Sequence, residues 1–121
     1  MGLPTQQRLN DHLVRWDREI KAFEVAVNEY GLKKAELEYE RAVLMEKARH
    51  EDEKISQASA ERLADADEGC YTLHRAFRTA EGAVEAIKAR LRWCAAVADA
   101  LRSEVSTERA EAQLYSGPGT P

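Results

Sequence analysis

The sequence predicts an all-α protein, built as a long antiparallel helical hairpin of the coiled-coil kind. The prolines lie at positions 4, 118 and 121, which leaves residues 5–117 without a helix breaker. Charged residues make up 33% of the chain and aromatic residues 7%, a balance typical of long helices. Two long runs of apolar residues also follow heptad spacing, and each run is predicted to form one helix.

The first helix is predicted over residues 6–49, with Thr5 as its N-cap. Its apolar residues recur at spacings that alternate between four and three. The same lattice passes through two charged positions, Lys34 and Arg41. The apolar members of this seam are Leu9, Leu13, Trp16, Ile20, Phe23, Val27, Tyr30, Leu37 and Leu44.

The second helix is predicted over residues 59–115, after an N-cap at Ser56 or Ser59. Gly69 and Gly82 each cost about 1 kcal/mol relative to alanine, but the heptad pattern continues through both. Ser116-Gly117-Pro118-Gly119 ends the helix, and residues 116–121 are predicted to form a flexible tail. The seam consists of Ala66, Cys70, Leu73, Phe77, Ala80, Val84, Ile87, Leu91, Cys94, Ala98, Leu101 and Val105.

A turn at residues 50–58 should fold the two helices into one hairpin, which spans residues 1–115. In the antiparallel hairpin, each seam residue of the first helix faces a seam residue of the second. The two seams match when the numbers of facing residues add to about 107, as they do for Tyr30 and Phe77. In that register Arg41 can reach Asp65 or Asp67. The segment from about residue 102 to 115 passes the start of the first helix, so it should be a protruding arm or a short third helix.

A second apolar stripe lies on the first helix away from its seam: Val25, Leu32 and Tyr39 at intervals of seven, flanked by Ala35 and Ala42. A monomeric hairpin would leave this stripe in water, which indicates a further partner. We expect a dimer or larger helical bundle, or another protein partner; the alternative is that the C-terminal arm folds back onto the stripe. Trp93, Val105, Leu114 and Tyr115 complete the candidate interface.

Nucleic-acid binding is a second hypothesis. The second helix combines basic residues with an aromatic ring that lies off the seam, namely Arg75, Arg78, Lys88, Arg90, Arg92 and Trp93. Interleaved Glu81, Glu85 and Asp99, and a net charge of −4, favour an ordinary solvated face instead. The leading interpretation is therefore a self-associating helical adaptor or inhibitor, and the alternative is a nucleic-acid-binding accessory factor in recombination or replication.

Sequence motifs for catalysis are absent: there is no nucleotide-binding glycine pattern, no nucleophile elbow and no Glu-x-x-His pair. Cys70 and His74 are four residues apart, but no other cysteine or histidine converges on them in the sequence. We therefore expect no catalytic residue, no metal site, no cofactor and no small-molecule substrate.

The sequence also bears on location. It contains no run of about 18 apolar residues, so no membrane association is expected. Cys70 and Cys94 would lie about 36 Å apart on one straight helix and could not form a disulfide within the chain. Both features favour the cytoplasm. The acidic segment of residues 51–68 could mimic a phosphate backbone, although it is also typical of a solvated turn.

The charged double heptad pattern over residues 60–115, which ends in "ALRSEVSTERAEAQLY", resembles short helical proteins encoded by tailed bacteriophages. Some of these proteins are found beside genes for DNA recombination or replication. The resemblance implies an accessory protein that acts in a host cytoplasm through other proteins or DNA. It rests on pattern alone and assigns no functional residue.

Overall fold

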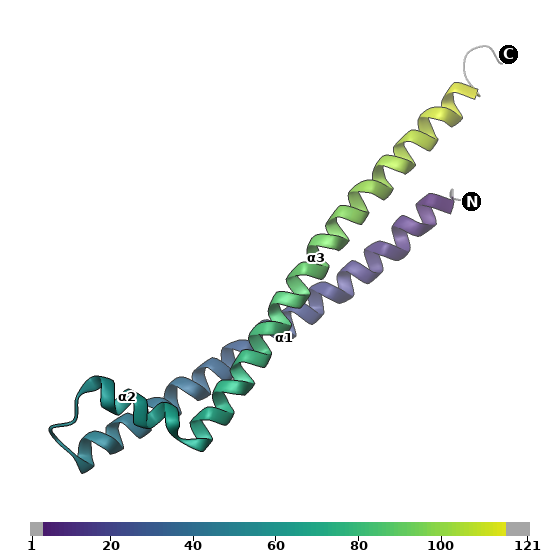
Figure 1. Ribbon diagram of the computed structural model, residues 1–121. Coiled ribbons are helices and arrows are strands. Elements are labelled where there is room, and N and C mark those ends of the chain that lie inside the picture. The colour runs from purple at the N-terminus through teal and green to yellow at the C-terminus, as the bar shows by residue number, and fades with distance from the viewer. Residues whose placement is uncertain (1–3, 116–121) are drawn as a thin grey trace. The chain divides into compact units, whose positions relative to one another are not determined.

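A computed structural model describes residues 4–115, and helices account for almost all of them (Figure 1). The elements are α1 (Pro4–Glu51), α2 (Gln57–Ala66) and α3 (Glu68–Tyr115), with no strand among the described residues. The long helices α1 and α3 pack against each other. The predicted all-α helical hairpin is therefore confirmed. The tail predicted at residues 116–121 lies outside the described residues.

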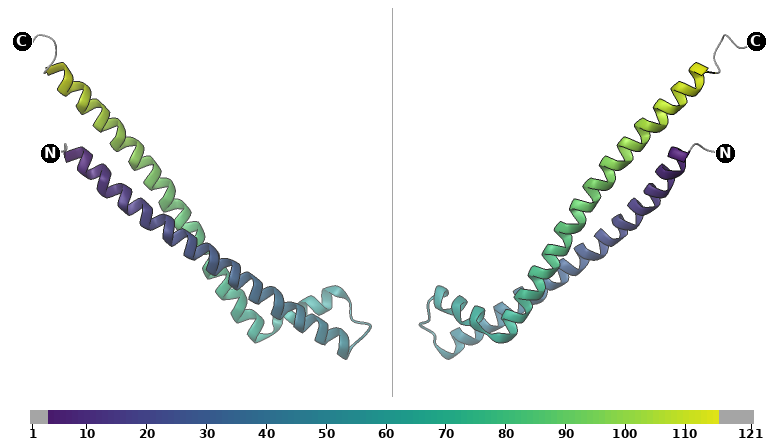
Figure 2. Two further views of the ribbon diagram at one scale, coloured as in Figure 1. Left: turned by 180° about the vertical axis from the view of Figure 1, so that it is seen from behind. Right: turned by 45° about the vertical axis from the view of Figure 1, so that its right-hand side comes forward.

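The chain divides into two compact units, and both long helices contribute to each. The terminal unit comprises Met1–Ala22 and Ile87–Pro121, and the turn unit comprises Phe23–Ala86. Within each unit α1 and α3 run in opposite directions, as the views in Figure 2 show. None of the three helices is long and apolar enough for a membrane span over the described residues.

The turn between α1 and α2 is shorter than predicted, because α1 continues to Glu51 and α2 starts at Gln57. Ser56 is the N-cap of α2: its backbone is extended, and its hydroxyl accepts a hydrogen bond from the Ser59 amide at 3.1 Å. The N-terminus of α1 is at Pro4, a first-turn position where the missing amide hydrogen costs nothing. The prediction of Thr5 as N-cap is therefore wrong, because Thr5 already lies within the helix.

The sequence predicts one continuous helix for the second half of the chain. The structure has two helices there, which meet at Asp67. Asp67 ends α2 with an extended backbone, ψ 133°. Its carboxylate then accepts a hydrogen bond from the Cys70 amide at 3.0 Å, and so satisfies an otherwise free amide in the first turn of α3. The break therefore follows from an aspartate that can serve as a cap at that point.

Small residues form the core of the turn unit where α2 lies beside the last turns of α1 (Figure 1). Its buried members are Met45, Ala48, Ala60 and Ala64, with Leu44 and Ile55 packed at the edge. A register in which paired residue numbers add to about 107 places Leu63 opposite Leu44, but Leu63 is exposed. The register was wrong here because α2 is a separate helix. Its alanines, rather than its leucine, face α1.

Two other contacts in the turn unit agree with the predicted register, one of them to α2 itself. The rings of Tyr30 and Phe77 lie 5.2 Å apart, centroid to centroid. The guanidinium of Arg41 donates to the Asp65 carboxylate at 2.9 Å, which is one of the two partners predicted for it. The hydrogen bond with this carboxylate raises the pKa of Arg41 above its ordinary value, so the arginine stays charged.

Larger residues form one core cluster of the terminal unit, and Cys94 and Ala98 of that unit are also buried. Leu9, Leu101 and Val105 are buried together, and Leu13 and Val97 pack against them. Contacts between α1 and α3 continue further out: the Thr5 hydroxyl donates to the Glu108 carboxylate, and Arg109 donates to the Gln6 side chain at 3.1 Å. The arm predicted to lack a partner from residue 102 is therefore paired as far as residue 109.

The register prediction missed this pairing because it assumed one constant offset along both helices. Near the N-terminus of α1, each α1 residue contacts a residue further along α3 than predicted. The residue numbers of Thr5 and Glu108, for example, add to 113 instead of about 107. Residues 110–115 of α3, the last part of the segment predicted as an arm, are exposed.

The two seams differ in how completely they are covered. From Cys70 to Val105, every predicted seam residue of α3 is buried or half-buried. On α1, in contrast, the seam residues Ile20 and Val27 remain exposed at 42% and 40%. Side-chain size does not explain the difference, because Ile87 and Val84 of α3 are only 8% exposed. The predicted start of the α3 seam at Ala66 is wrong, since Ala66 ends α2 and is exposed.

Candidate ligand-binding groove

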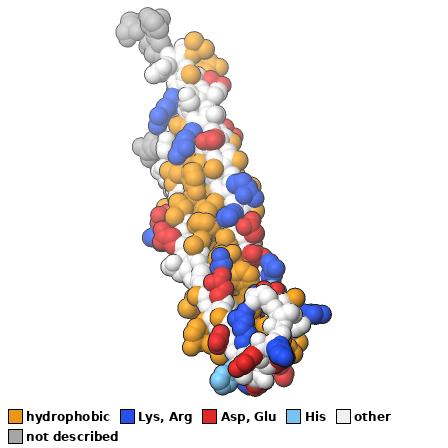
Figure 3. Space-filling view, turned by 90° about the vertical axis from the view of Figure 1, so that its left-hand side faces the viewer, with side chains coloured by type: hydrophobic (Ala, Val, Ile, Leu, Met, Phe, Trp, Pro, Cys, Tyr) orange, Lys and Arg blue, Asp and Glu red, His pale blue; other side chains and the backbone are white. Residues whose placement is uncertain are grey.

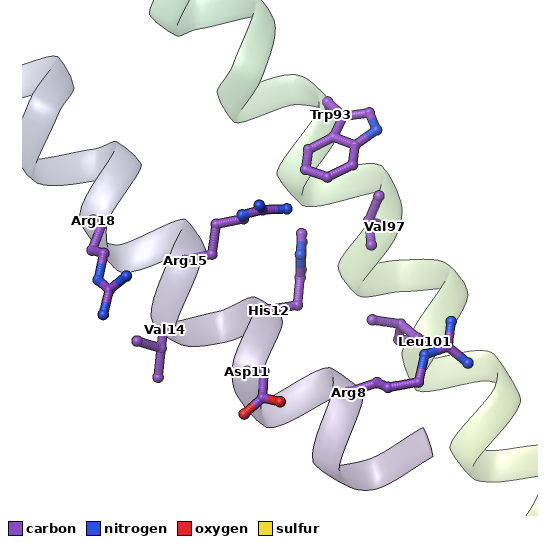
Figure 4. A pocket seen from close by; sticks show the side chains of 9 residues that line it. All are labelled: Arg8, Asp11, His12, Val14, Arg15, Arg18, Trp93, Val97 and Leu101. Carbon is purple, nitrogen blue, oxygen red and sulfur yellow. The ribbon is translucent and has the colours of Figure 1, made fainter. Parts of the chain in front are cut away.

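The terminal unit carries a shallow groove of about 610 Å³ between α1 and α3 (Figure 4). Its walls combine three arginines with two aromatic rings, a carboxylate and three apolar side chains. From α1 come Arg8, Asp11, His12, Val14, Arg15 and Arg18, and from α3 come Trp93, Val97 and Leu101. We call this surface the arginine groove.

Trp93 lies at one end of the α3 wall, followed along the helix by Val97 and Leu101 (Figure 4). His12 and Arg15 project from α1 toward its ring in Figure 4. The His12 ring meets it edge-on at 5.6 Å, and the Arg15 guanidinium carbon lies 5.8 Å from the ring centroid. Trp93 is still 51% exposed, so part of the indole remains open to a ligand. Its position off the seam, unexplained by the heptad pattern, is explained by these two contacts.

The His12 side chain is held in place by a hydrogen bond between the two helices. It is buried, and its Nε2 lies 2.7 Å from the Cys94 carbonyl oxygen. A carbonyl oxygen can only accept a hydrogen bond, so Nε2 must carry the proton. This bond ties the imidazole of α1 to the backbone of α3 and thereby holds the ring against which Trp93 rests.

The arginines differ in their partners. Arg8 forms an exposed ion pair with Glu104 at 3.5 Å. Arg15 and Arg18 form no ion pair with any described residue, although the chain contains 22 carboxylate side chains. Asp11 shares the wall, where one carboxylate oxygen accepts a hydrogen bond from Gln7 at 2.9 Å. The groove therefore presents two arginines without an ion-pair partner among the described residues, together with the Asp11 carboxylate in the same wall.

Most residues of the predicted nucleic-acid surface do not reach the groove. Arg75 and Arg78 belong to the turn unit, where Arg78 pairs with Glu81 at 2.9 Å. In the terminal unit Arg90 pairs with Glu19 at 2.8 Å. Lys88 and Arg92 are exposed but do not line the groove. Of that set, only Trp93 lies in the groove, and its basic neighbours come from α1 instead.

The predicted register already places basic residues of α1 beside Trp93. With paired numbers adding to about 107, Trp93 falls opposite residue 14, which is flanked on α1 by His12 and Arg15. The nucleic-acid hypothesis considered only cations close to Trp93 along the chain. In a hairpin, cations across the interface are equally near.

The predicted stripe lies exposed on α1 within the turn unit. Val25, Leu32 and Tyr39 are 70%, 53% and 72% exposed, and their flanking residues Ala35 and Ala42 are exposed as well. Val43 extends the same side of the helix by one more turn and is also exposed. We call Val25, Leu32, Tyr39 and Val43 the α1 stripe.

The remaining candidate interface residues lie on α3. Leu114 and Tyr115 are exposed near the end of α3, as expected. Val105 was also predicted to contact a partner, but it is only 4% exposed and packs against Leu9 and Leu101. That prediction is wrong because α1 already covers this turn of α3.

Cys70 and Cys94 are both buried free thiols. Burial raises the pKa of the Cys70 thiol, and the nearby carboxylates of Asp65 and Asp67 raise it further. A thiol in that setting is a poor nucleophile. Cys70 and His74 share a cavity wall, but no three or more metal-ligating side chains cluster within residues 4–115.

No protein-family model, curated protein or solved structure matches this chain.

Proposed function

We propose that this protein is a non-enzymatic helical adaptor or inhibitor that associates with a second copy of itself through the α1 stripe. The observation that carries this proposal is the exposure of Val25, Leu32 and Tyr39 on one side of a helix whose other side packs on α3. Three large apolar side chains at heptad spacing form the seam that a second helix would need. Figure 3 shows hydrophobic side chains at the surface among charged ones.

The stripe is suited to pairing with an identical helix in the opposite direction. In a two-fold symmetric contact, residue i meets residue j and residue j meets residue i. An axis at Leu32 would place Leu32 against its counterpart and Val25 against Tyr39 on each side. The smallest side chain would then meet the largest, whereas a parallel pair would place tyrosine against tyrosine and valine against valine.

The edges of the stripe also support a close helix contact. Ala35 and Ala42 lie along one edge, where small side chains allow two helices to approach. Glu29, Lys33 and Glu36 lie along the other edge, and Lys33 bridges both glutamates at 3.7 and 3.5 Å. These charges are thus partly neutralised within one chain.

Light scattering tests the proposal. We expect a molar mass of about twice the 13.6 kDa of one chain, and a shift toward one chain in Leu32→Asp, because a carboxylate would be buried at the centre of the contact. Leu63→Asp is the matched control: it makes the same change at an exposed leucine outside the candidate interface. A wild-type protein that is monomeric at all concentrations would refute self-association.

In line with the phage-protein resemblance, we further propose that the dimer acts in the cytoplasm as an accessory protein, by bridging or occluding other macromolecules. A pull-down from the native host that recovers the same partner with wild type, but not with Leu32→Asp, would support this role. Recovery of no partner under native conditions would count against it.

A further inference from the structure

We propose that the arginine groove is a binding site for single-stranded nucleic acid, in which Arg15 and Arg18 hold phosphates and Trp93 stacks on a base. This site lies in the terminal unit and is independent of the self-association proposed for the α1 stripe. Each proposal can therefore fail without the other.

The first support is charge. The terminal unit contains nine lysines and arginines against seven aspartates and glutamates, a net charge of +2 in a chain whose total is −4. Most of its other cations are paired, as Arg90 is with Glu19 and Arg102 with Asp99. Arg15 and Arg18, in contrast, have no carboxylate partner among the described residues and can take an external anion without breaking an ion pair. Guanidinium groups bind phosphate oxygens through two parallel hydrogen bonds.

The second support is spacing. Arg8, Arg15 and Arg18 lie along one side of α1, separated by seven and three residues. From the first to the last they extend over about 15 Å, at 1.5 Å per residue. That length accommodates several successive phosphates of an extended strand, while a single anion would need only one of these arginines.

The third support is the state of Trp93. Its indole is held by His12 and Arg15 and yet is 51% exposed, which makes it a fixed aromatic platform beside the cations. His12 is itself fixed by the Cys94 carbonyl. An aromatic ring beside arginines binds unstacked bases, which only a single strand offers. An acidic peptide would use the arginines but would gain little from the indole.

Fluorescence anisotropy with labelled oligothymidylate and the full chain tests the site. We expect binding at low salt that weakens as salt rises, because bound phosphates release counterions. Arg15→Gln combined with Arg18→Gln should weaken binding by about tenfold or more, and reduce the slope of log K against log salt by about 1.4. The matched control replaces Arg90 and Arg102 with glutamine. It removes the same charge from the same unit outside the groove, and it should leave most of the affinity.

The role of Trp93 requires a separate pair of variants. Trp93→Ala should weaken binding by roughly tenfold, whereas Trp93→Phe should retain most of the affinity because a phenyl ring also stacks. Circular dichroism of each variant checks that its helices are intact. An unchanged affinity in Trp93→Ala would remove the stacking role.

Three outcomes would overturn the proposal. The first is no oligothymidylate binding at low salt, and the second is equal loss of affinity in the groove variant and its charge-matched control. The third is binding of a duplex, or competition by oligoglutamate, at the same affinity as the single strand. That result would assign the groove to general anion binding or to an acidic protein.

Discussion

The two units of this molecule are built from the same two helices, yet they differ in core, charge and surface. The terminal unit packs leucine and valine in its core, carries a net charge of +2 and exposes arginines around Trp93. The turn unit packs mainly alanine and carries nine basic and fifteen acidic residues, a net charge of −6. It exposes the α1 stripe. One heptad pattern can therefore support two surfaces with opposite chemistry.

The difference in cores gives the largest expected effect. Leu101→Ala in the terminal unit should lower the free energy of unfolding by about 2 to 5 kcal/mol, because it leaves a cavity beside Leu9 and Val105. Chemical denaturation measures the change. Leu114→Ala, at an exposed leucine of the same helix, should change stability by less than about 0.5 kcal/mol. Equal effects of the two would contradict the assigned core.

The reverse substitution probes the turn unit. Ala64 is 1% exposed and packs with Ala60 against α1, so Ala64→Leu should destabilise the fold by about 1 to 3 kcal/mol through overpacking. Ala66→Leu, at the exposed last residue of α2, is the control. Stabilisation by Ala64→Leu would show that the alanine core has unfilled space, and the contrast between the two cores would then disappear.

A smaller effect is expected at the break between α2 and α3. Asp67→Ala removes the cap on the Cys70 amide and should cost about 1 kcal/mol of stability, whereas Asp67→Ser can still cap and should cost less. Thermal unfolding of the three proteins compares them. If Asp67→Ala were more stable than wild type, the second half of the chain would favour one continuous helix, as the heptad pattern alone predicts.

The charge difference predicts a modest but opposite response to salt. Two turn units of charge −6 repel each other, so self-association through the α1 stripe should strengthen as ionic strength rises from about 0.1 to about 1 M. Oligonucleotide binding by the arginine groove should weaken over the same range. Sedimentation and anisotropy measured in the same buffers test both. Parallel responses would mean that the two surfaces do not act separately.

Much of the fold could be predicted because it depends on apolar periodicity. The heptad spacing identified both long helices, the α3 seam from Cys70 to Val105 and the pairing of Tyr30 with Phe77. The break at Asp67 was missed, since a continuous apolar lattice outweighed a single capping residue. The capping signal was nevertheless present, as an aspartate three residues before Cys70.

The groove was harder to predict, because it depends on which side chains meet across the interface. Trp93 was identified as an aromatic ring off the seam, but its basic neighbours were sought along α3. Arg15 and His12 lie more than 75 positions away in the sequence and are brought to Trp93 only by the hairpin register. The burial of Val105 was missed for a related reason, since contacts at the outer end depart from a constant offset.

The central claim is that the α1 stripe pairs with itself around Leu32, and disulfide cross-linking tests it most directly. Cys70 and Cys94 are buried, so mild oxidation should act mainly on an introduced surface thiol. An antiparallel pair predicts a covalent dimer for Leu32→Cys and very little for Val25→Cys, whose counterpart would lie two heptads away. Failure of Leu32→Cys to cross-link, or equal cross-linking by Val25→Cys, would contradict the claim.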